Sequence, residues 1–335
     1  MNLRAPSMID VAKHSGVSHQ TVSRVLNNNQ SVSSATRKKV LESIAELGYQ
    51  PNLAARALVT GRTFTIGVLS FDSGLYGPSS MLHAIQTAAK DEGYRVILTS
   101  IRSIDEQSLT DGIGELTNSR VDGIVIISPQ SSDLKELASI KTRLPVVAPE
   151  SPTPKKIPCL NTNQYEGAGL ALKHLLSLGH KKIGHISGPL DWFDASQRLR
   201  AWKTELEDAG LTTEHLALGD WTPQSGYDGA KKLMKDPGVT AIFAANDAMA
   251  VGVLHALNEM KLRVPEDVSV VGFDNIQESS LLIPGLTTVN QDFSRIGHEL
   301  LALLIRLITH EKVAHFRSEV IPELVIREST GKPRQ

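Results

Sequence analysis

Apolar side chains recur at helical spacing three times within the first fifty residues, and polar or glycine breaks separate the three stretches. A repeat of about 3.6 residues is typical of an amphipathic helix with one buried face. Helices are therefore predicted at 8–15, 19–26 and 34–47, with Gly16 and Gly48 as stops. The side chains expected to face their core are Ile9, Val11, Ala12, Val22, Val25, Leu26, Val40, Leu41, Ile44 and Leu47.

A short segment after these helices has a different character. Residues 53–60 favour a helix, but the segment is too short to hold a helix in water by itself. It is predicted to be a linker, or a helix that forms only under particular conditions.

From Phe64 onward, short apolar runs alternate with helical stretches. Such alternation predicts parallel sheets with helices on both faces, and two series of it predict a two-lobed α/β body. The expected strands are 65–69, 95–98, 123–127, 145–147, 183–186, 241–244 and 268–271. The expected helices are 79–92, 105–118, 132–142, 165–178, 195–209, 225–235, 247–260 and 293–309, followed by a strand at 319–326.

The charge is uneven along the chain. In total, 35 Lys and Arg against 36 Asp and Glu give a net charge of −1. Residues 1–65 carry eight Lys and Arg against three Asp and Glu, which gives +5 there and −6 in the remainder. A basic module on an acidic body favours binding of a polyanion by the first part alone.

The single cysteine and the absence of long apolar runs indicate in which cellular compartment the protein is found. Cys159 has no partner for an internal disulfide, and it is expected to be an ordinary buried or loop thiol in a reducing cytosol. The N-terminus has no apolar signal segment, and no apolar run approaches the roughly 18–20 residues that span a bilayer. A cytoplasmic, nucleoid-associated protein with no membrane contact is expected.

The strongest motif covers the first two predicted helices and the turn between them. It reads Asp10-Val11-Ala12-x-x-x-Gly16-Val17-Ser18-x-x-Thr21-Val22-Ser23-Arg24-Val25-Leu26-Asn27. A helix that enters the major groove of DNA needs small or polar residues at its N-terminal end. Here Gln20 can pair with adenine, Arg24 with guanine or phosphate, and the Ser18 and Thr21 hydroxyls with phosphates. A helix-turn-helix unit is predicted.

Further motifs occur along the rest of the chain. They are Gly48-Tyr49-x-Pro51-Asn52-x-x-Ala55-Arg56-x-Leu58, Ala244-x-Asn246-Asp247-x-Met249-Ala250, Val268-Ser269-Val270-Val271-Gly272-Phe273-Asp274 and Leu286-Thr287-Thr288-Val289-x-Gln291-Asp292-Phe293. With these motifs the chain resembles the LacI/GalR family of bacterial repressors over almost its whole length. Gly188-Pro189-Leu190 and Gly219-Asp220-Trp221 are similar to the lac repressor type in particular.

The resemblance implies roles in DNA binding. His19, Gln20 and Arg24 would read base edges, and His19 replaces a tyrosine of the lac repressor type, which affects the operator sequence. Residues 52–58 would form a hinge helix only on DNA and press Leu58 between base pairs in the minor groove. The complete set of expected DNA-binding residues is Ser18, His19, Gln20, Thr21, Ser23, Arg24, Asn27, Ser33, Thr36, Asn52, Ala55, Arg56 and Leu58.

A binding cleft is expected between the lobes, where the strands end. Asn246 and Asp274 each follow an apolar strand directly, although Asn246 could merely cap a helix, Trp221 could be a core residue and Arg198 a surface ion-pair partner. Carboxylate, amide and guanidinium groups share sugar hydroxyls, while aromatic faces cover the C–H side of a sugar ring. The expected ligand-binding residues are Leu75, Pro78, Glu150, Trp192, Asp194, Arg198, Trp221, Asn246, Asp274, Gln291 and Phe293.

Several effectors fit this set. A galactoside inducer is favoured by the combination of Arg198, Asn246, Asp274 and Trp221. A glucoside-type disaccharide is the alternative, because Asp194 and Trp192 reshape one wall. A purine corepressor is disfavoured, because two aromatic residues that would sandwich it cannot be placed.

Other classes of function find little support. Gly112-x-Gly114 lacks the third glycine of a dinucleotide loop, and neither a phosphate loop nor a nucleophile elbow occurs. His310 and His315 lack a third ligand at usable spacing. No enzyme activity, cofactor or metal is expected. A solute-binding transport protein is opposed by the missing signal segment and the basic module.

The expected architecture is an all-α helix-turn-helix domain followed by a doubly wound core like that of periplasmic binding proteins. The expected boundaries are 1–50 for the helix-turn-helix, 51–62 for the hinge and linker, 63–161 with 293–318 for the first lobe, and 162–292 with 319–330 for the second. The expected function is repression of carbohydrate-utilisation genes by a homodimer on a palindromic operator. A sugar would change the lobe angle and release the DNA.

Overall fold

The computed structural model describes residues 6–26, 31–49, 61–71, 74–101, 105–127, 142–149, 157–311, 313 and 317–334. The chain forms two compact units, residues 1–63 and 64–335. Some predicted features lie outside the described residues. They are the helix at 132–142, the hinge segment, Asn27, Asn52, Ala55, Arg56, Leu58 and Glu150.

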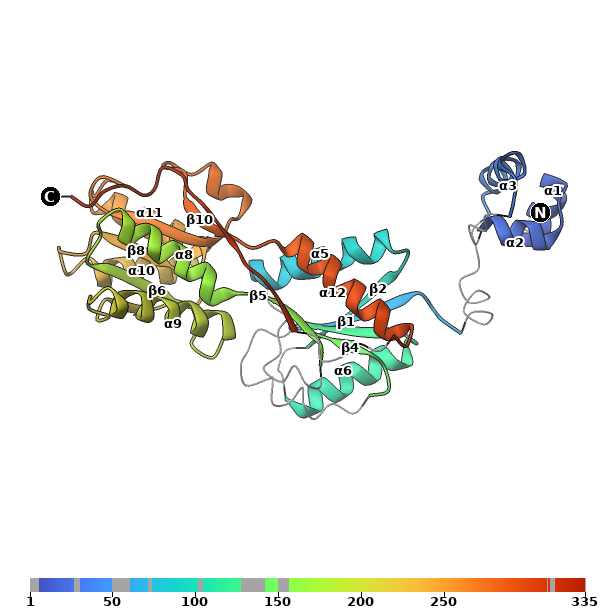
Figure 1. Cartoon of the computed structure of the whole chain (residues 1–335), viewed down its shortest axis with the longest axis horizontal. Coiled ribbons are helices and arrows are strands. Elements are labelled where there is room, and N and C mark those ends of the chain that lie inside the picture. Colours follow the sequence, from blue (N-terminus) through green and yellow to red (C-terminus); the bar gives the residue numbers. More distant parts are fainter. Residues whose placement is uncertain are drawn as a thin grey trace. The chain divides into compact units, whose positions relative to one another are not determined.

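The first unit contains the predicted helices α1 (Met8–Ser15), α2 (His19–Leu26) and α3 (Ser34–Leu47) (Figure 1). Ser7 and Asp10 form a capping box at the start of α1, in which each side chain accepts a hydrogen bond from the other residue's backbone N–H. Gly16 and Gly48 take the left-handed conformation that ends α1 and α3.

The core of the first unit differs from the prediction at its edges. Val11, Val22 and Val40, one from each helix, are fully buried at its centre. The inward placement of Ile9 and Leu41 was wrong, because these side chains are 54% and 52% exposed. Leu41 follows the buried Val40, and Ile9 lies two residues before the buried Val11. Each residue turns a helix by about 100°, so both side chains point away from the core.

The second unit begins with a parallel sheet of order β2-β1-β3-β4 (Figure 1). Its strands are β1 (Thr65–Phe71), β2 (Arg95–Ile101), β3 (Gly123–Ile127) and β4 (Val146–Val147). The helices α5 (Tyr76–Asp91) and α12 (Phe293–Ile308) cover one face, and α6 (Glu106–Asn118) covers the other. Ile66 and Val68 pack toward α5 and α12 and Leu69 toward α6, as the period of two along a strand requires.

A second sheet has the order β12-β10-β9-β8-β6-β7. Its strands β6 (Ile183–Ser187), β7 (Leu216–Leu218), β8 (Ala241–Ala244), β9 (Ser269–Asp274) and β10 (Thr287–Asn290) are parallel, whereas β12 (Glu323–Val325) is antiparallel. The helices α8 (Gln164–Ser177) and α9 (Phe193–Asp208) cover one face, and α10 (Pro223–Leu233) and α11 (Asp247–Glu259) cover the other. The carboxyl ends of the parallel strands meet at one edge.

The chain passes between the two sheets three times. The first passage lies between β4 and α8, the second leads from β10 to α12, and the third leads from β11 (Arg317–Val320) to β12. The strand β5 (Cys159–Thr162), in the first passage, pairs in parallel with β11, in the third. A single strand at 319–326 was a wrong prediction. Residues Ile321 and Pro322 separate β11 from β12, and proline has no N–H to donate to a ladder.

Three short strands were not predicted. These strands, β5, β7 and β10, have only three or four residues each, too few to show an alternating pattern. Cys159 is therefore a buried strand residue rather than part of a loop. Within the described residues, none of the helices combines the length and the apolar character that crossing a membrane requires.

Candidate functional site

Polar side chains gather where three parallel strands of the second sheet end. Asn246 follows β8, Asp274 is the last residue of β9, and Gln291 follows β10. All three are buried, with exposed fractions of 6–7%. Strand ends in an open α/β sheet border the crevice where ligands bind. The sheet topology therefore brings together residues that lie up to 45 positions apart in the sequence, since 291 − 246 = 45.

Arg198, on α9, is the centre of this group. It is 2% exposed, which rules out the alternative of a surface ion-pair partner. Its guanidinium donates to Gln164 Oε1 from Nε at 3.0 Å and from Nη2 at 2.8 Å, and to the backbone oxygen of Ala245. Its Nη2 also lies 3.7 Å from Asp194 and 3.9 Å from Asp274. The bonds to Gln164 and Ala245 hold the guanidinium in place. The carboxylates of Asp194 and Asp274 lie beyond hydrogen-bond distance from it, so both can still accept hydrogen bonds from a ligand.

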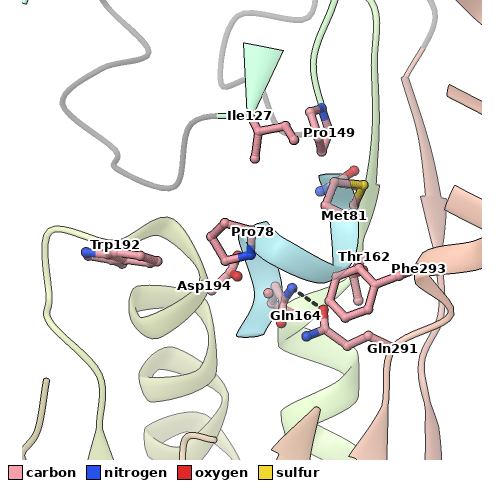
Figure 2. A pocket seen from close by; sticks show the side chains of 12 residues that line it. Pro78, Met81, Ile127, Pro149, Thr162, Gln164, Trp192, Asp194, Gln291 and Phe293 are labelled. Atoms are coloured by element: carbon pink, nitrogen blue, oxygen red, sulfur yellow. Dashed lines mark hydrogen bonds between the residues drawn. The ribbon is translucent and has the colours of Figure 1, made fainter. Parts of the chain in front are cut away.

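A chain of buried amides continues from Arg198. Gln164 Nε2 donates to Gln291 Oε1 at 2.9 Å, and Gln291 Nε2 donates to Asp274 Oδ1 at 2.8 Å (Figure 2). Gln164 was missed by the sequence reasoning. The signal that could have found it is a polar residue directly after a crossing between lobes, but β5 was too short to be predicted.

Two tryptophans form the aromatic wall of the site. Trp192 and Trp221 meet edge to face, with ring centroids 5.6 Å apart, and the Arg198 guanidinium lies 5.6 Å from the Trp221 ring. Gly188 makes room for Trp221, because a Cβ at this position would come within 2.3 Å of the indole. Trp221 is 6% exposed, so it is a core residue that also lines the site.

Asn246 serves two purposes. Its Oδ1 accepts from Met249 N at 2.8 Å and so caps α11, and its Nδ2 donates to the Trp221 backbone oxygen at 3.2 Å. The capping role and the position in the site are therefore both observed. Its neighbour Asp247 is fully buried and accepts hydrogen bonds from Ser279 and Thr288.

Burial is the largest influence on the pKa of Asp247 and of Asp274. It raises the pKa of Asp274 to about 7, against the opposing effect of the Arg198 cation. Burial likewise raises the pKa of Asp247 to about 6, and the hydrogen bonds from Ser279 and Thr288 oppose that shift. Asp274 is therefore poised between a neutral and a charged form, and a ligand that donates hydrogen bonds favours the charged form.

Two adjoining cavities open at these residues. The first, of about 340 Å³, is lined by the polar Arg198, Asn246 and Asp274 and by Trp221, Leu75 and Tyr76. The second, of about 510 Å³, is lined by Phe293 and by residues of both sheets (Figure 2). The residues common to both cavities are Gly77, Pro78, Trp192, Asp194 and Gln291. The predicted residues other than Glu150 thus line one cavity or both. The lining residues absent from the prediction are Tyr76, Gly77, Met81, Ile127, Pro149, Asn161, Thr162 and Gln164.

The face of α2 in the first unit is a second candidate site. Ser18, His19, Gln20 and Arg24 are exposed, whereas Thr21 and Ser23 are half-buried. The hydroxyls of Ser18 and Thr21 lie 2.9 Å apart in a hydrogen bond. The predicted residues Ser33 and Thr36 belong to the start of α3, where the Ser33 Oγ accepts from Thr36 N at 3.2 Å. The side chains predicted to read bases are thus presented to solvent, and hydrogen bonds between polar side chains and backbone cap the helix ends.

The described residues include no group of three His, Cys, Asp or Glu side chains that could hold a metal ion. The buried His185 instead makes stacking contacts with Trp202 and with Phe243, and burial lowers its pKa to about 4. It is therefore a neutral core residue, as its position on β6 suggests.

Comparisons with known proteins agree with this picture. Residues 7–52 match the model of bacterial regulatory proteins of the lacI family, and residues 172–330 match that of a periplasmic binding protein-like domain. The HTH-type transcriptional repressor PurR of Mannheimia succiniciproducens is 35% identical over 328 residues, which cover 96% of this chain and 98% of the relative.

Solved structures are similar over nearly the full length. The lac repressor dimer bound to operator and the anti-inducer ONPF is 33% identical, with a TM-score of 0.81 over 98% of this chain and 100% of that chain. The complex of the transcriptional regulator CelR with cellobiose is 30% identical, with a TM-score of 0.71 over 97% of this chain and 99% of that chain. The predicted fold class, with its helix-turn-helix and binding-protein-like core, is confirmed by these matches.

Proposed function

Because this chain belongs to the lacI family of bacterial regulatory proteins and is a DNA-binding transcriptional repressor, we propose that a galactoside bound beside Arg198 releases it from its operator. The observation that carries this proposal is that Arg198, Asp194, Asp274 and Asn246 line one cavity together with Trp221. Charged and amide groups of this kind bind ring hydroxyls, and an indole covers the apolar face of a sugar.

The cavity is lined by residues from both lobes, so a bound ligand contacts both of them. Leu75 and Pro78 come from the start of α5 beside the first sheet, while Arg198 and Asp274 belong to the second. Gln291 lies in the passage from β10 to α12. A ligand that contacts all of these residues binds one arrangement of the lobes more tightly than another. The difference in binding free energy between the two arrangements can shift the protein between them and so regulate DNA binding.

On the DNA side, two copies of the chain would bind a near-palindromic operator at the nucleoid. The exposed His19, Gln20 and Arg24 of α2 would read bases in the major groove. The hinge segment 52–58 would form its helix on DNA, with Leu58 in the minor groove. The solved lac repressor is a dimer on its operator, which supports the same assembly here.

A purine effector is the second candidate, because the 35% identical relative is named PurR. A planar base would be sandwiched between parallel aromatic rings. Trp192 and Trp221 are instead inclined by 64°, with centroids 5.6 Å apart, which leaves no room for a third ring between them. This geometry favours a sugar. A glucoside-type disaccharide remains the alternative within the sugar class, and the solved CelR complex with cellobiose is a relative of that kind.

The test is a mobility-shift titration with an operator selected from genomic fragments. Methyl β-galactoside, methyl β-glucoside, lactose, cellobiose, adenine, guanine and hypoxanthine are each added to the preformed complex. A galactoside is expected to weaken operator binding by roughly 5–150-fold. Strengthened binding with a purine base, or no response to any sugar, would overturn the proposed effector. Failure to bind DNA with salt-sensitive affinity would contradict the DNA-binding assignment.

A further inference from the structure

Two residues that line the second cavity carry buried hydrogen-bond acceptors without a partner, and the bonds around Arg198 do not account for them. Asn161, on β5, lines this cavity and is 7% exposed. Its Oδ1 is buried and has no hydrogen-bond partner among the described residues. The same holds for Oδ1 of Asp194, which lines both cavities. A buried acceptor without a hydrogen bond costs free energy of folding. We therefore expect a ligand or a water molecule to donate a hydrogen bond to each of these two atoms.

The chemistry of the lining restricts what that ligand can be. Both unfilled atoms are acceptors, so the ligand must carry donors such as hydroxyl groups. The described lining of this cavity includes no Lys, Arg or His, which disfavours a phosphate or carboxylate there. Trp192 and Phe293 add apolar faces on which a ring can lie (Figure 2). A neutral hydroxylated ring meets all three conditions.

The two cavities are adjacent, since both are bordered by Pro78, Trp192, Asp194 and Gln291. A ligand can therefore extend from one cavity into the other without crossing the protein. We propose that the effector is an unphosphorylated disaccharide, with one ring beside Arg198 and the second ring in a subsite read by Asn161. This inference rests on the proposed sugar response and adds the size of the sugar and a specificity-determining residue.

The test compares disaccharides with single rings by isothermal titration calorimetry of the full-length protein. The probes are lactose and cellobiose, each against the methyl glycoside of its non-reducing ring. Two variants form a matched pair, Asn161→Ala in the second cavity and Asn246→Ala in the first. The wild type is expected to bind one disaccharide at least about tenfold more tightly than the corresponding methyl glycoside.

The variants should divide this preference between the cavities. Asn161→Ala is expected to reduce the ratio of disaccharide to methyl-glycoside affinity about tenfold, whereas Asn246→Ala weakens both ligands and leaves the ratio within about twofold of wild type. If Asn161→Ala does not fold, Asn161→Leu also removes the Oδ1 acceptor but keeps a side chain of similar size. Circular dichroism checks the fold of each variant.

The outcomes separate this inference from the function on which it rests. If single rings bind as tightly as disaccharides, the second subsite is wrong while the sugar response stands. A disaccharide preference that survives in the Asn161 variants overturns the role of Asn161. If no sugar binds the wild type, the proposed sugar response fails and this inference fails with it.

Discussion

The helix α2, which we propose reads DNA, and the cleft of the second unit each present an arginine, but they hold it in different ways. Arg24 lies exposed on α2. Arg198 is 2% exposed and donates to Gln164 and Ala245, with two carboxylates within 4 Å. Replacing an exposed side chain alters binding and leaves the stability of the fold nearly unchanged. Replacing a buried and hydrogen-bonded side chain alters both binding and stability. The two sites should therefore respond differently to equivalent substitutions.

Replacing the buried arginine should have the largest effect. Arg198→Met leaves Asp274 and Gln164 without their buried cationic partner, so we expect the free energy of unfolding to fall by about 3–5 kcal/mol. Sugar binding should be abolished as well. Urea unfolding and calorimetry measure the two effects. Arg200→Met is the matched control, because Arg200 is exposed on the same helix and stacks on Tyr165, and its removal should cost less than about 1 kcal/mol.

A conservative variant separates positioning from stability at this site. Arg198→Lys keeps the positive charge but cannot donate to Gln164 and Ala245 in the same fixed geometry. It should fold and still lose most of its sugar affinity. Wild-type sugar affinity in this variant would show that the bonded guanidinium is not required for recognition.

Replacing the exposed Arg24 should have a smaller effect, which is confined to operator binding. Arg24→Met removes one base or phosphate contact, so we expect operator affinity to fall by about 1–3 kcal/mol, or roughly 5–150-fold. The free energy of unfolding should change by less than about 0.5 kcal/mol. Fluorescence anisotropy with labelled operator measures the loss, and Arg295→Met in the second unit is the control. Equal losses in the two variants would contradict base reading by α2.

The smallest expected effect is the pH dependence of stability that the buried Asp274 produces. Asp274 has a pKa of about 7 in the folded protein and an ordinary value of 3.8, so the folded state holds a proton that the unfolded chain has lost. This contribution to stability is fully present below about pH 4 and disappears as the pH rises through 7. Between about pH 6.5 and 8, the free energy of unfolding should fall by about 1 kcal/mol.

The variant Asp274→Asn checks this assignment, because an amide does not titrate in this range. Urea unfolding at several pH values should give a flatter profile for the variant than for the wild type. The His185 imidazole, whose pKa is lowered to about 4, acts at lower pH and with the opposite sign. Burial also raises the pKa of Asp247 to about 6 and lowers the pKa of His174 and of His180. The variant retains these groups, so the difference between the two pH profiles reports Asp274. Parallel profiles for the two proteins would show that another group is responsible.

The difference between the two regions also explains how well each could be predicted. The three helices of the first unit follow from local periodicity and caps, so only the two edge positions Ile9 and Leu41 were misplaced. In the cleft, Asn246 and Asp274 were found because each follows a recognisable apolar strand. Gln164 and Asn161 were missed because they follow or belong to β5, whose pairing partner β11 lies more than 150 residues away.

The sequence by itself determined most of the described helices, the longer strands and the general chemistry of the cleft. Helical spacing, glycine stops and apolar runs specify local structure, and the polar residues after the strands specify what kind of ligand the cleft can accept. The tertiary structure decided how those residues are connected. The bonds from Arg198 to Gln164, from Gln164 to Gln291 and from Gln291 to Asp274 join two strand ends and two helices. Such bonds depend on sheet order and on passages between lobes, which no local pattern contains.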